Sequence, residues 1–192
     1  MFDQLDAVRS HIAERLSEAA SNRKSPMHTP VVGTADGEMR VMVMRDFDTG
    51  SWTLRFHTDA RSPKVATIGE GAPVSVLLYD PGAKVQIRVK GIGRVESAGP
   101  VADKAWAEAN NFARRCYLAE AAPGAPSDSP TSGLPPEVEG IEPDDATLIT
   151  ARENFAVLLV RLESADWLYL AHTGHRRAQF DLGSGEGRWV VP

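Results

Sequence analysis

The stretch from residue 40 to residue 91 most constrains the fold, because it alternates short strand patterns with strong turn signals. Residues 52–58 alternate large and polar side chains, as a half-buried strand does. Residues 72–78 form a nearly continuous apolar run that is typical of a buried strand, and the turn sequence Tyr79-Asp80-Pro81-Gly82 follows it. Residues 85–89 then alternate again. The stretch therefore predicts strand, turn, strand, a short helix, strand, turn and strand.

Hydroxyl and cationic side chains gather where the helix within this stretch should begin. Ser62 followed by Pro63 is typical of an N-cap with proline at the first helical position. Arg61 and Lys64 add positive charge beside the free N–H groups of the first turn, and Thr58 adds a hydroxyl donor. These groups together predict a phosphate site. The alternative is a capped surface helix with two solvated cations.

Three segments of the chain form an ordered series of motifs. They are Arg40-Val41-Met42-Val43-Met44-Arg45, Phe56-His57-Thr58-Asp59-Ala60-Arg61-Ser62-Pro63-Lys64 and Val85-Gln86-Ile87-Arg88-Val89-Lys90-Gly91. In order and spacing they resemble the R-x-V-L-L-K, F-Y-T-N-x-x-S-R-K and R-Q-V-R-I-x-G segments of the pyridoxamine 5′-phosphate oxidase family of FMN-binding split barrels. The chain departs from that pattern at Pro63, where the family has arginine, and at Arg45, where it has lysine.

The resemblance implies a cofactor, an assembly and a set of binding residues. It implies FMN as the cofactor, a small-molecule substrate, and a homodimer with FMN at the subunit interface. Residues 40–86 would come from one chain and the C-terminal residues from the other. Gln86 would hydrogen-bond the polar edge of the isoalloxazine, because an amide offers both a donor and an acceptor. The implied cofactor-binding residues are Arg40, Val41, Met42, Val43, Arg45, His57, Thr58, Arg61, Ser62, Lys64, Gln86, Trp167 and Arg177. The motifs assign no catalytic residue.

The strand patterns along the whole chain predict a mainly β fold. About eight or nine short strands with turn signals favour a closed antiparallel barrel with peripheral helices. The resemblance makes this an FMN-binding split barrel, and we expect residues 1–192 to form a single domain. Residues 39–47 are expected to be one strand, on which Arg40 and Arg45 point to opposite faces unless a bulge intervenes.

Besides the short helix after Ser62, two helices and one long loop are expected outside the strands. Apolar side chains at three- and four-residue steps predict an amphipathic N-terminal helix within residues 1–21. Residues 101–120 predict another helix, with Arg114 and Arg115 as structural charges near its end. Residues 121–145 are rich in proline and acidic side chains, which predicts a loop or lid that is either functional or disordered.

The C-terminal segment departs from the substrate-binding pattern of the family. The family has R-L-H-D-R-F, whereas this chain has His175-Arg176-Arg177-Ala178-Gln179-Phe180. The resemblance therefore implies FMN-dependent redox chemistry with little or no oxidation of pyridoxamine 5′-phosphate. An anionic substrate of another kind stays open, because several arginines remain in this region.

Composition excludes several other classes of protein. A net charge of -5 indicates no global attraction to nucleic acid. A single cysteine, Cys116, forms no internal disulfide and suits a reducing, cytoplasmic location. No apolar run approaches membrane-spanning length, and no paired cysteines or clustered histidines suggest a metal site. The remaining alternatives are a flavin- or haem-binding split barrel without oxidase turnover, or a barrel that has lost its cofactor.

Overall fold

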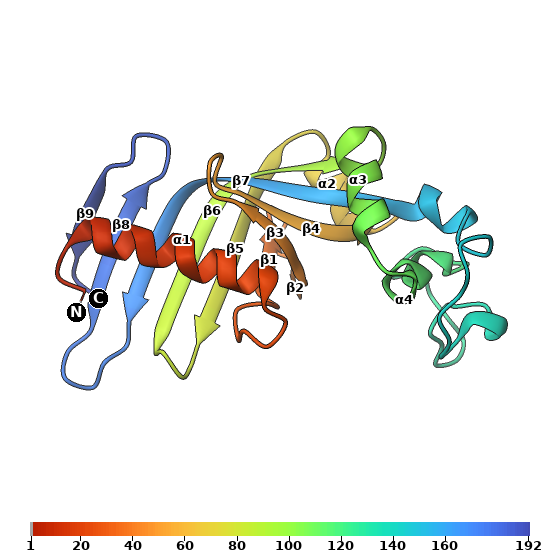
Figure 1. Cartoon of the computed structure of the whole chain (residues 1–192), viewed down its shortest axis with the longest axis horizontal. Coiled ribbons are helices and arrows are strands. Elements are labelled where there is room, and N and C mark those ends of the chain that lie inside the picture. The colour runs from red at the N-terminus through yellow and green to blue at the C-terminus, as the bar shows by residue number, and fades with distance from the viewer. Residues whose placement is uncertain (1) are drawn as a thin grey trace.

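The computed structural model of the protein describes residues 2–192, which form one curled antiparallel sheet with helices on its sides (Figure 1). The helices are α1 (Leu5–Ser21), α2 (Pro63–Ile68), α3 (Pro100–Glu108) and α4 (Asn111–Arg114), with 3-10 turns at η1 (Arg115–Leu118), η2 (Pro136–Val138) and η3 (Thr150–Asn154). The strands are β1 (Val31–Thr34), β2 (Met39–Val41), β3 (Met44–Asp48), β4 (Thr53–Asp59), β5 (Ala72–Asp80), β6 (Val85–Glu96), β7 (Phe155–Tyr169), β8 (Arg176–Asp181) and β9 (Gly187–Val190). The predicted mainly β class with peripheral helices is confirmed.

The sheet follows the order β2-β1-β5-β6-β7-β4-β3, and β8 and β9 extend from β7. β7 pairs with β6 along both of its halves, whereas its first half also pairs with β4 and its second half with β8. The sheet curls until its two ends meet. The N–H of Met42 donates to the carbonyl of Pro30 at 3.0 Å, and the N–H of Met44 donates to the carbonyl of His28 at 2.9 Å.

The expected strand over residues 39–47 is therefore two strands, β2 and β3, with Met42 and Val43 between them. The single-strand prediction was wrong because the backbone of this segment changes partners. β2 pairs with β1, whereas β3 pairs with β4. A strand that must join both ends of a curled sheet cannot keep one straight ladder.

α1 lies across the sheet from β8 and β9 toward β1 (Figure 1). Its side chains Val8, Ile12, Leu16 and Ala19 are fully buried and belong to the main core. They recur at steps of three and four residues, so one stripe of the helix faces the sheet. Among the described residues, no helix is long and apolar enough to cross a membrane.

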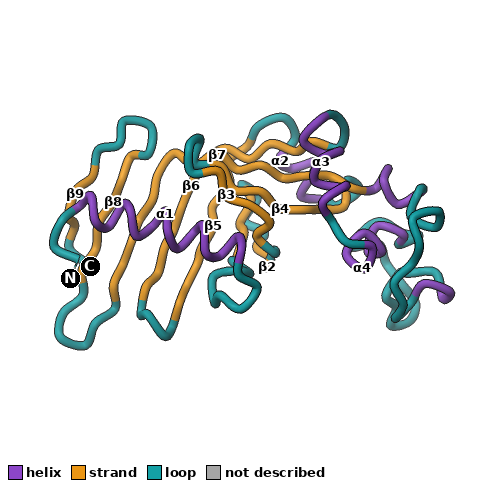
Figure 2. Tube along the Cα trace, in the orientation of Figure 1, coloured by secondary structure: helices purple, strands orange, loops and turns teal. Residues whose placement is uncertain are grey.

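The expected helix over residues 101–120 is broken into α3, α4 and η1. The reason is Asn110, whose side-chain oxygen accepts the N–H of Ala113 at 2.8 Å and so caps a new helix. The Tyr117 ring then packs on Phe155 with 5.1 Å between ring centroids. α4, η1 and the loops that follow them as far as η3 form a lobe beside the sheet, and Figure 2 draws these loops in teal.

Gly91 lies at a register shift between β6 and β7. A Cβ at this position would lie 2.0 Å from the carbonyl oxygen of Arg161, which belongs to the neighbouring backbone. A glycine in a strand interior often marks such a close approach. Gly71, by contrast, is exposed, and a Cβ there would meet only the Ile92 side chain at 3.6 Å.

We expect Gly91→Ala to lower the free energy of unfolding by at least about 2 kcal/mol, because two backbones must move apart. Gly71→Ala is the matched control and should change the same quantity by no more than about 0.5 kcal/mol. Urea denaturation of both variants measures the difference. Equal stability of the two variants would contradict the close approach at the bulge.

Candidate functional site

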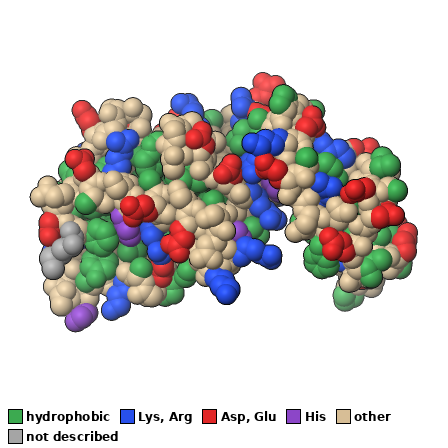
Figure 3. Space-filling model, in the orientation of Figure 1, with side chains coloured by type: hydrophobic (Ala, Val, Ile, Leu, Met, Phe, Trp, Pro, Cys, Tyr) green, Lys and Arg blue, Asp and Glu red, His purple; other side chains and the backbone are tan. Residues whose placement is uncertain are grey.

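A cleft of about 770 Å³ lies between the sheet and the lobe. The outline of the molecule is indented between these two parts, and Lys or Arg side chains lie at the indentation (Figure 3). Most of the residues that the motifs single out line this one cleft. They are Arg40, Val41, Met42, Val43, Arg45, His57, Thr58 and Lys64.

The break between β2 and β3 brings Arg40 and Arg45 to the same cleft. In one straight strand they would point to opposite faces, as the alternation of side chains requires. The alternation is interrupted at Met42 and Val43, which lie between the strands, and at Arg45, where the register of β3 against β4 shifts. Arg40 also donates to the Thr34 hydroxyl at 2.8 Å, which holds its guanidinium on this side of the sheet.

Lys64 lies at the centre of the residues that are predicted to bind a phosphate. Its ammonium donates to the Thr58 hydroxyl at 3.0 Å and to the Ser62 hydroxyl at 2.5 Å. Ser62 directly precedes α2, as predicted for an N-cap, but its side chain makes no capping hydrogen bond. α2 has only six residues, so its dipole is small. The side chains rather than the helix end therefore supply the positive charge.

The electrostatic state of Lys64 fits an anion beside it. Burial lowers the pKa of Lys64 below its ordinary value, and the nearby charge of Arg40 lowers it further. An anion between these two cations would relieve both effects, because it stabilises the charged ammonium and screens the like-charge repulsion. The residues present thus fit a phosphate group.

His57 lies deeper in the cleft and is kept neutral. Burial lowers its pKa to about 3, and the charges of Arg45 and Arg55 add to the shift. Its Nε2 atom is buried without a hydrogen-bond partner within residues 2–192. The ring packs edge-on against Phe155, with centroids 4.9 Å apart. A neutral imidazole can donate a hydrogen bond through one ring nitrogen and accept one through the other.

Arg61 does not line the cleft with the other predicted residues. It pairs with the Asp59 carboxylate through Nε at 3.0 Å and Nη2 at 2.8 Å. Its Nη2 also donates to the carbonyl of Ala119 at 2.9 Å, and its Nη1 donates to the carbonyl of Glu120 at 3.3 Å. The structure thus directs the guanidinium toward the lobe.

Gln86, Trp167 and Arg177 lie outside the cleft. Trp167 is fully buried in the core beneath α1, where its Nε1 donates to the His11 ring at 3.2 Å. Gln86 lies in β6 on the sheet face that carries Arg88, opposite the core. Within one chain, none of these three residues lines the cleft beside Lys64.

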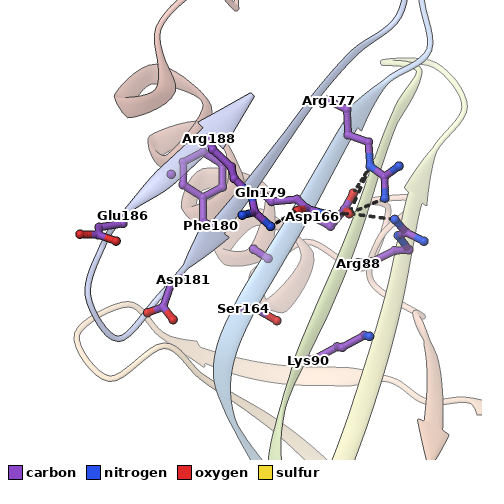
Figure 4. Close-up of a pocket in the computed structure, with 12 residues that line it drawn as sticks. Arg88, Lys90, Ser164, Asp166, Arg177, Gln179, Phe180, Asp181, Glu186 and Arg188 are labelled. Carbon is purple, nitrogen blue, oxygen red and sulfur yellow. Dashed lines mark hydrogen bonds and ion pairs between the residues drawn. The ribbon is translucent and has the colours of Figure 1, made fainter. Parts of the chain in front are cut away.

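Arg177 lines a second pocket, of about 740 Å³, on that outer face of β6, β7, β8 and β9 (Figure 4). The Asp166 carboxylate lies at its centre and accepts from Arg177 at 2.7 Å, from Arg88 at 2.8 Å and from Gln179 at 3.0 Å. Burial alone would raise the pKa of Asp166, but these hydrogen bonds and charges outweigh it and lower the pKa.

The lobe supplies cleft residues that the motifs did not identify. Cys116, Tyr117 and residues 119–127 and 131–134 form the wall opposite Lys64. Burial raises the pKa of the Tyr117 hydroxyl, so this group stays protonated. The only sequence signal for this wall is the proline-rich composition of residues 121–145. Within the described chain, no group of three His, Cys, Asp or Glu side chains could hold a metal ion.

Comparison with known families finds one matching domain. Residues 7–97 match the family model of the pyridoxamine 5′-phosphate oxidase, FMN-binding domain. The predicted resemblance is therefore confirmed over this segment, and the match supports FMN as the cofactor. None of the curated proteins matches the chain.

Several solved structures share the fold. A pyridoxamine 5′-phosphate oxidase-related, FMN-binding protein from Nostoc punctiforme has a TM-score of 0.66 at 22% identity, over 96% of each chain. PhzG from Burkholderia lata, solved with tetrahydrophenazine-1-carboxylic acid, has a TM-score of 0.69 at 16% identity, over 100% of this chain and 98% of that chain. A general stress FMN/FAD binding protein from Xanthomonas citri has a TM-score of 0.51 at 14% identity, over 82% and 88%.

The pH dependence of stability tests the state of His57. Because its pKa of about 3 lies below the ordinary 6.5, the unfolded chain takes up this proton more readily between those values. The contribution of the neutral ring is fully present above pH 6.5 and is lost as the pH falls toward 3. We expect His57→Gln to lose less unfolding free energy than the wild type over this interval, by up to about 1.4 kcal/mol per pH unit.

Urea denaturation at several pH values measures this difference. The exposed His172 offers the control, since His172→Asn should keep the wild-type dependence. Parallel pH profiles for the wild type and His57→Gln would show that His57 is not held neutral by the fold.

Proposed function

We propose that this chain, whose residues 7–97 match the pyridoxamine 5′-phosphate oxidase FMN-binding domain, binds FMN in the cleft beside Lys64. The observation that carries the proposal is the convergence of Arg40, Arg45 and Lys64 on one cleft. Among the described lining residues the carboxylates are Asp59 and Glu120, and Asp59 is already paired with Arg61. A phosphate here gains charge-assisted hydrogen bonds.

The remaining motif residues suit the flavin ring. Met42 and Val43 lie where the backbone runs between two strands, so part of its hydrogen-bonding capacity is free of a sheet ladder. His57 lines the cleft with a neutral imidazole, and such a ring can donate or accept a hydrogen bond at a polar edge of the isoalloxazine. The cleft residues thereby bind the phosphate at one end and orient the ring toward the lobe.

Bound FMN supplies reversible redox chemistry, so the proposed activity is that of an FMN-dependent oxidoreductase acting on a small molecule. Pyridoxamine 5′-phosphate is not the expected substrate, because residues 175–180 lack the family's substrate pattern. The second candidate is a flavin- or haem-binding protein without turnover. The match of residues 7–97 to an FMN-binding domain favours flavin over haem.

The proposal extends to a homodimer that shares the site. Met39, Val41, Leu77 and Tyr79 are exposed apolar side chains. Cross-strand pairing through Val31 and Gly33 places them on one sheet face. The pairing continues to Gln86 and to the pocket around Asp166. A two-fold contact through this face would cover the apolar patch and let Gln86 and Arg177 of one subunit reach the flavin of the other. Gln86 would then come from the chain opposite Arg40, and not from the same chain as the resemblance implied.

Two further expectations belong to this proposal. Residues 1–192 act as a single domain, because the described elements share one sheet. The single cysteine and the proposed redox chemistry suit a cytoplasmic location.

Lys64→Ala tests the phosphate site. Loss of a charge-assisted hydrogen bond should weaken FMN binding by about 1.5–3 kcal/mol, measured by quenching of flavin fluorescence. Lys104→Ala is the control, since that lysine lies on α3 with a side chain 73% exposed and should leave the FMN dissociation constant unchanged. An unchanged constant for Lys64→Ala would place the phosphate elsewhere.

Light scattering tests the assembly. We expect a wild-type mass of about twice the 20.8 kDa of one chain, and a mass near 20.8 kDa for Leu77→Asp. The latter variant should also bind FMN more weakly, because the shared contacts are lost. Val101→Asp, an exposed apolar residue on α3, should remain dimeric. A wild-type monomer that still binds FMN would rule out a shared site.

A further inference from the structure

The segment that forms the wall of the cleft opposite Lys64 does not pack into the hydrophobic core. We call residues 119–134 the strap. None of its residues is buried, and none belongs to either hydrophobic cluster of the protein. An irregular segment without core contacts is expected to be mobile unless specific hydrogen bonds hold it.

Specific hydrogen bonds do hold the base of the strap. Arg61 donates to the carbonyls of Ala119 and Glu120, at 2.9 and 3.3 Å. The N–H of Glu120 donates to the carbonyl of Gly133 at 3.0 Å, which closes the strap into a loop. Just before the strap, the Asn154 amide donates to the carbonyl of Tyr117 at 2.9 Å.

Arg61 is itself fixed by Asp59. The pair is bidentate, and the Asp59 side chain is only 9% exposed. A bidentate arginine–carboxylate pair fixes the plane of the guanidinium, so its remaining N–H groups point in a defined direction. These N–H groups point toward the carbonyls of Ala119 and Glu120, where the strap begins.

The chemistry of the strap differs from that of the opposite wall. Its contribution to the cleft is mainly alanine, proline, glycine, serine, threonine and leucine, and Glu120 is its single ionisable residue there. The cations of the cleft lie on the opposite side. Once a phosphate neutralises them, an anion against the strap would meet the Glu120 carboxylate and no further cation among the lining residues of the same chain, which costs free energy in a partly dehydrated cleft.

We propose that the strap is the substrate wall of the flavin cleft, that it selects an uncharged and mainly apolar ring compound, and that Arg61 is the positioning residue that holds it. The substrate assignment rests on the proposed FMN site, whereas the positioning role of Arg61 does not. Arg61 acts on the substrate only through the strap, and it leaves the phosphate to Lys64, Arg40 and Arg45.

The test compares a charge-neutral double variant, Asp59→Asn with Arg61→Met, against Arg161→Met, an exposed arginine outside the cleft. Removing both members of the ion pair keeps the net charge beside the phosphate constant. Hydrogen exchange measures how fast the amides of the strap exchange, and flavin fluorescence measures the FMN dissociation constant. The absorption spectrum of the bound flavin measures the binding of two probes of equal shape, neutral benzamide and anionic benzoate.

We expect the wild type to bind benzamide at least about tenfold more tightly than benzoate. The double variant should exchange amides of residues 119–134 at least about tenfold faster and bind benzamide about tenfold more weakly, with its FMN dissociation constant within about threefold of the wild type. Arg161→Met should match the wild type in all three measurements. A merely structural defect would lower FMN affinity as well.

Three results would overturn the proposal. Benzoate binding as tightly as benzamide, or no binding of either probe to FMN-loaded protein, would remove the strap from the substrate site. If the double variant loses FMN while the amides of the strap exchange as slowly as in the wild type, Arg61 binds the phosphate and does not position the strap. If the wild type binds no FMN, the proposed FMN site is wrong. The hydrogen-exchange rates of residues 119–134 in the double variant and the wild type still decide whether Arg61 holds the strap.

Limited proteolysis of the wild type covers the case in which the double variant does not fold. A cut within residues 119–134 of the FMN-loaded protein should abolish benzamide binding and leave FMN bound. Retained benzamide binding after the cut would contradict the proposal.

Discussion

The site depends on two backbone hydrogen bonds at the point where the sheet meets itself. The N–H groups of Met42 and Met44 donate to the carbonyls of Pro30 and His28. A strand that stayed straight would satisfy these groups in one ladder and would separate Arg40 from Arg45. Because the chain changes partners here and the register of β3 against β4 shifts at Arg45, both arginines reach the same cleft, and β4 carries His57 and Thr58 to its floor.

Local sequence chemistry predicted the parts of the protein in which neighbours along the chain also interact in space. The Ser62-Pro63 sequence predicted where α2 begins. Thr58, Ser62 and Lys64 were predicted to form a phosphate site, and in the structure Lys64 donates to both hydroxyls. The alternating patterns predicted most of the strands. The predicted resemblance is confirmed over residues 7–97, and the curled antiparallel sheet confirms the predicted fold class.

Features that depend on long-range contacts could not be predicted in this way. Arg61 donates to carbonyls 58 and 59 residues away, and Trp167 donates to His11 near the other end of the chain. Neither partner is marked by a local motif. The break at Asn110 was predictable in principle, because asparagine is a favoured N-cap, but the helical periodicity around it masked that signal.

A crystal structure of the FMN complex tests the central claim most directly. The account predicts the phosphate within hydrogen-bond distance of Lys64, with the ring along Met42 and Val43 and one face toward residues 119–134. The Arg61–Asp59 pair should remain intact in that complex. A phosphate bound instead by Arg88 and Arg177 in the pocket around Asp166 would contradict the account.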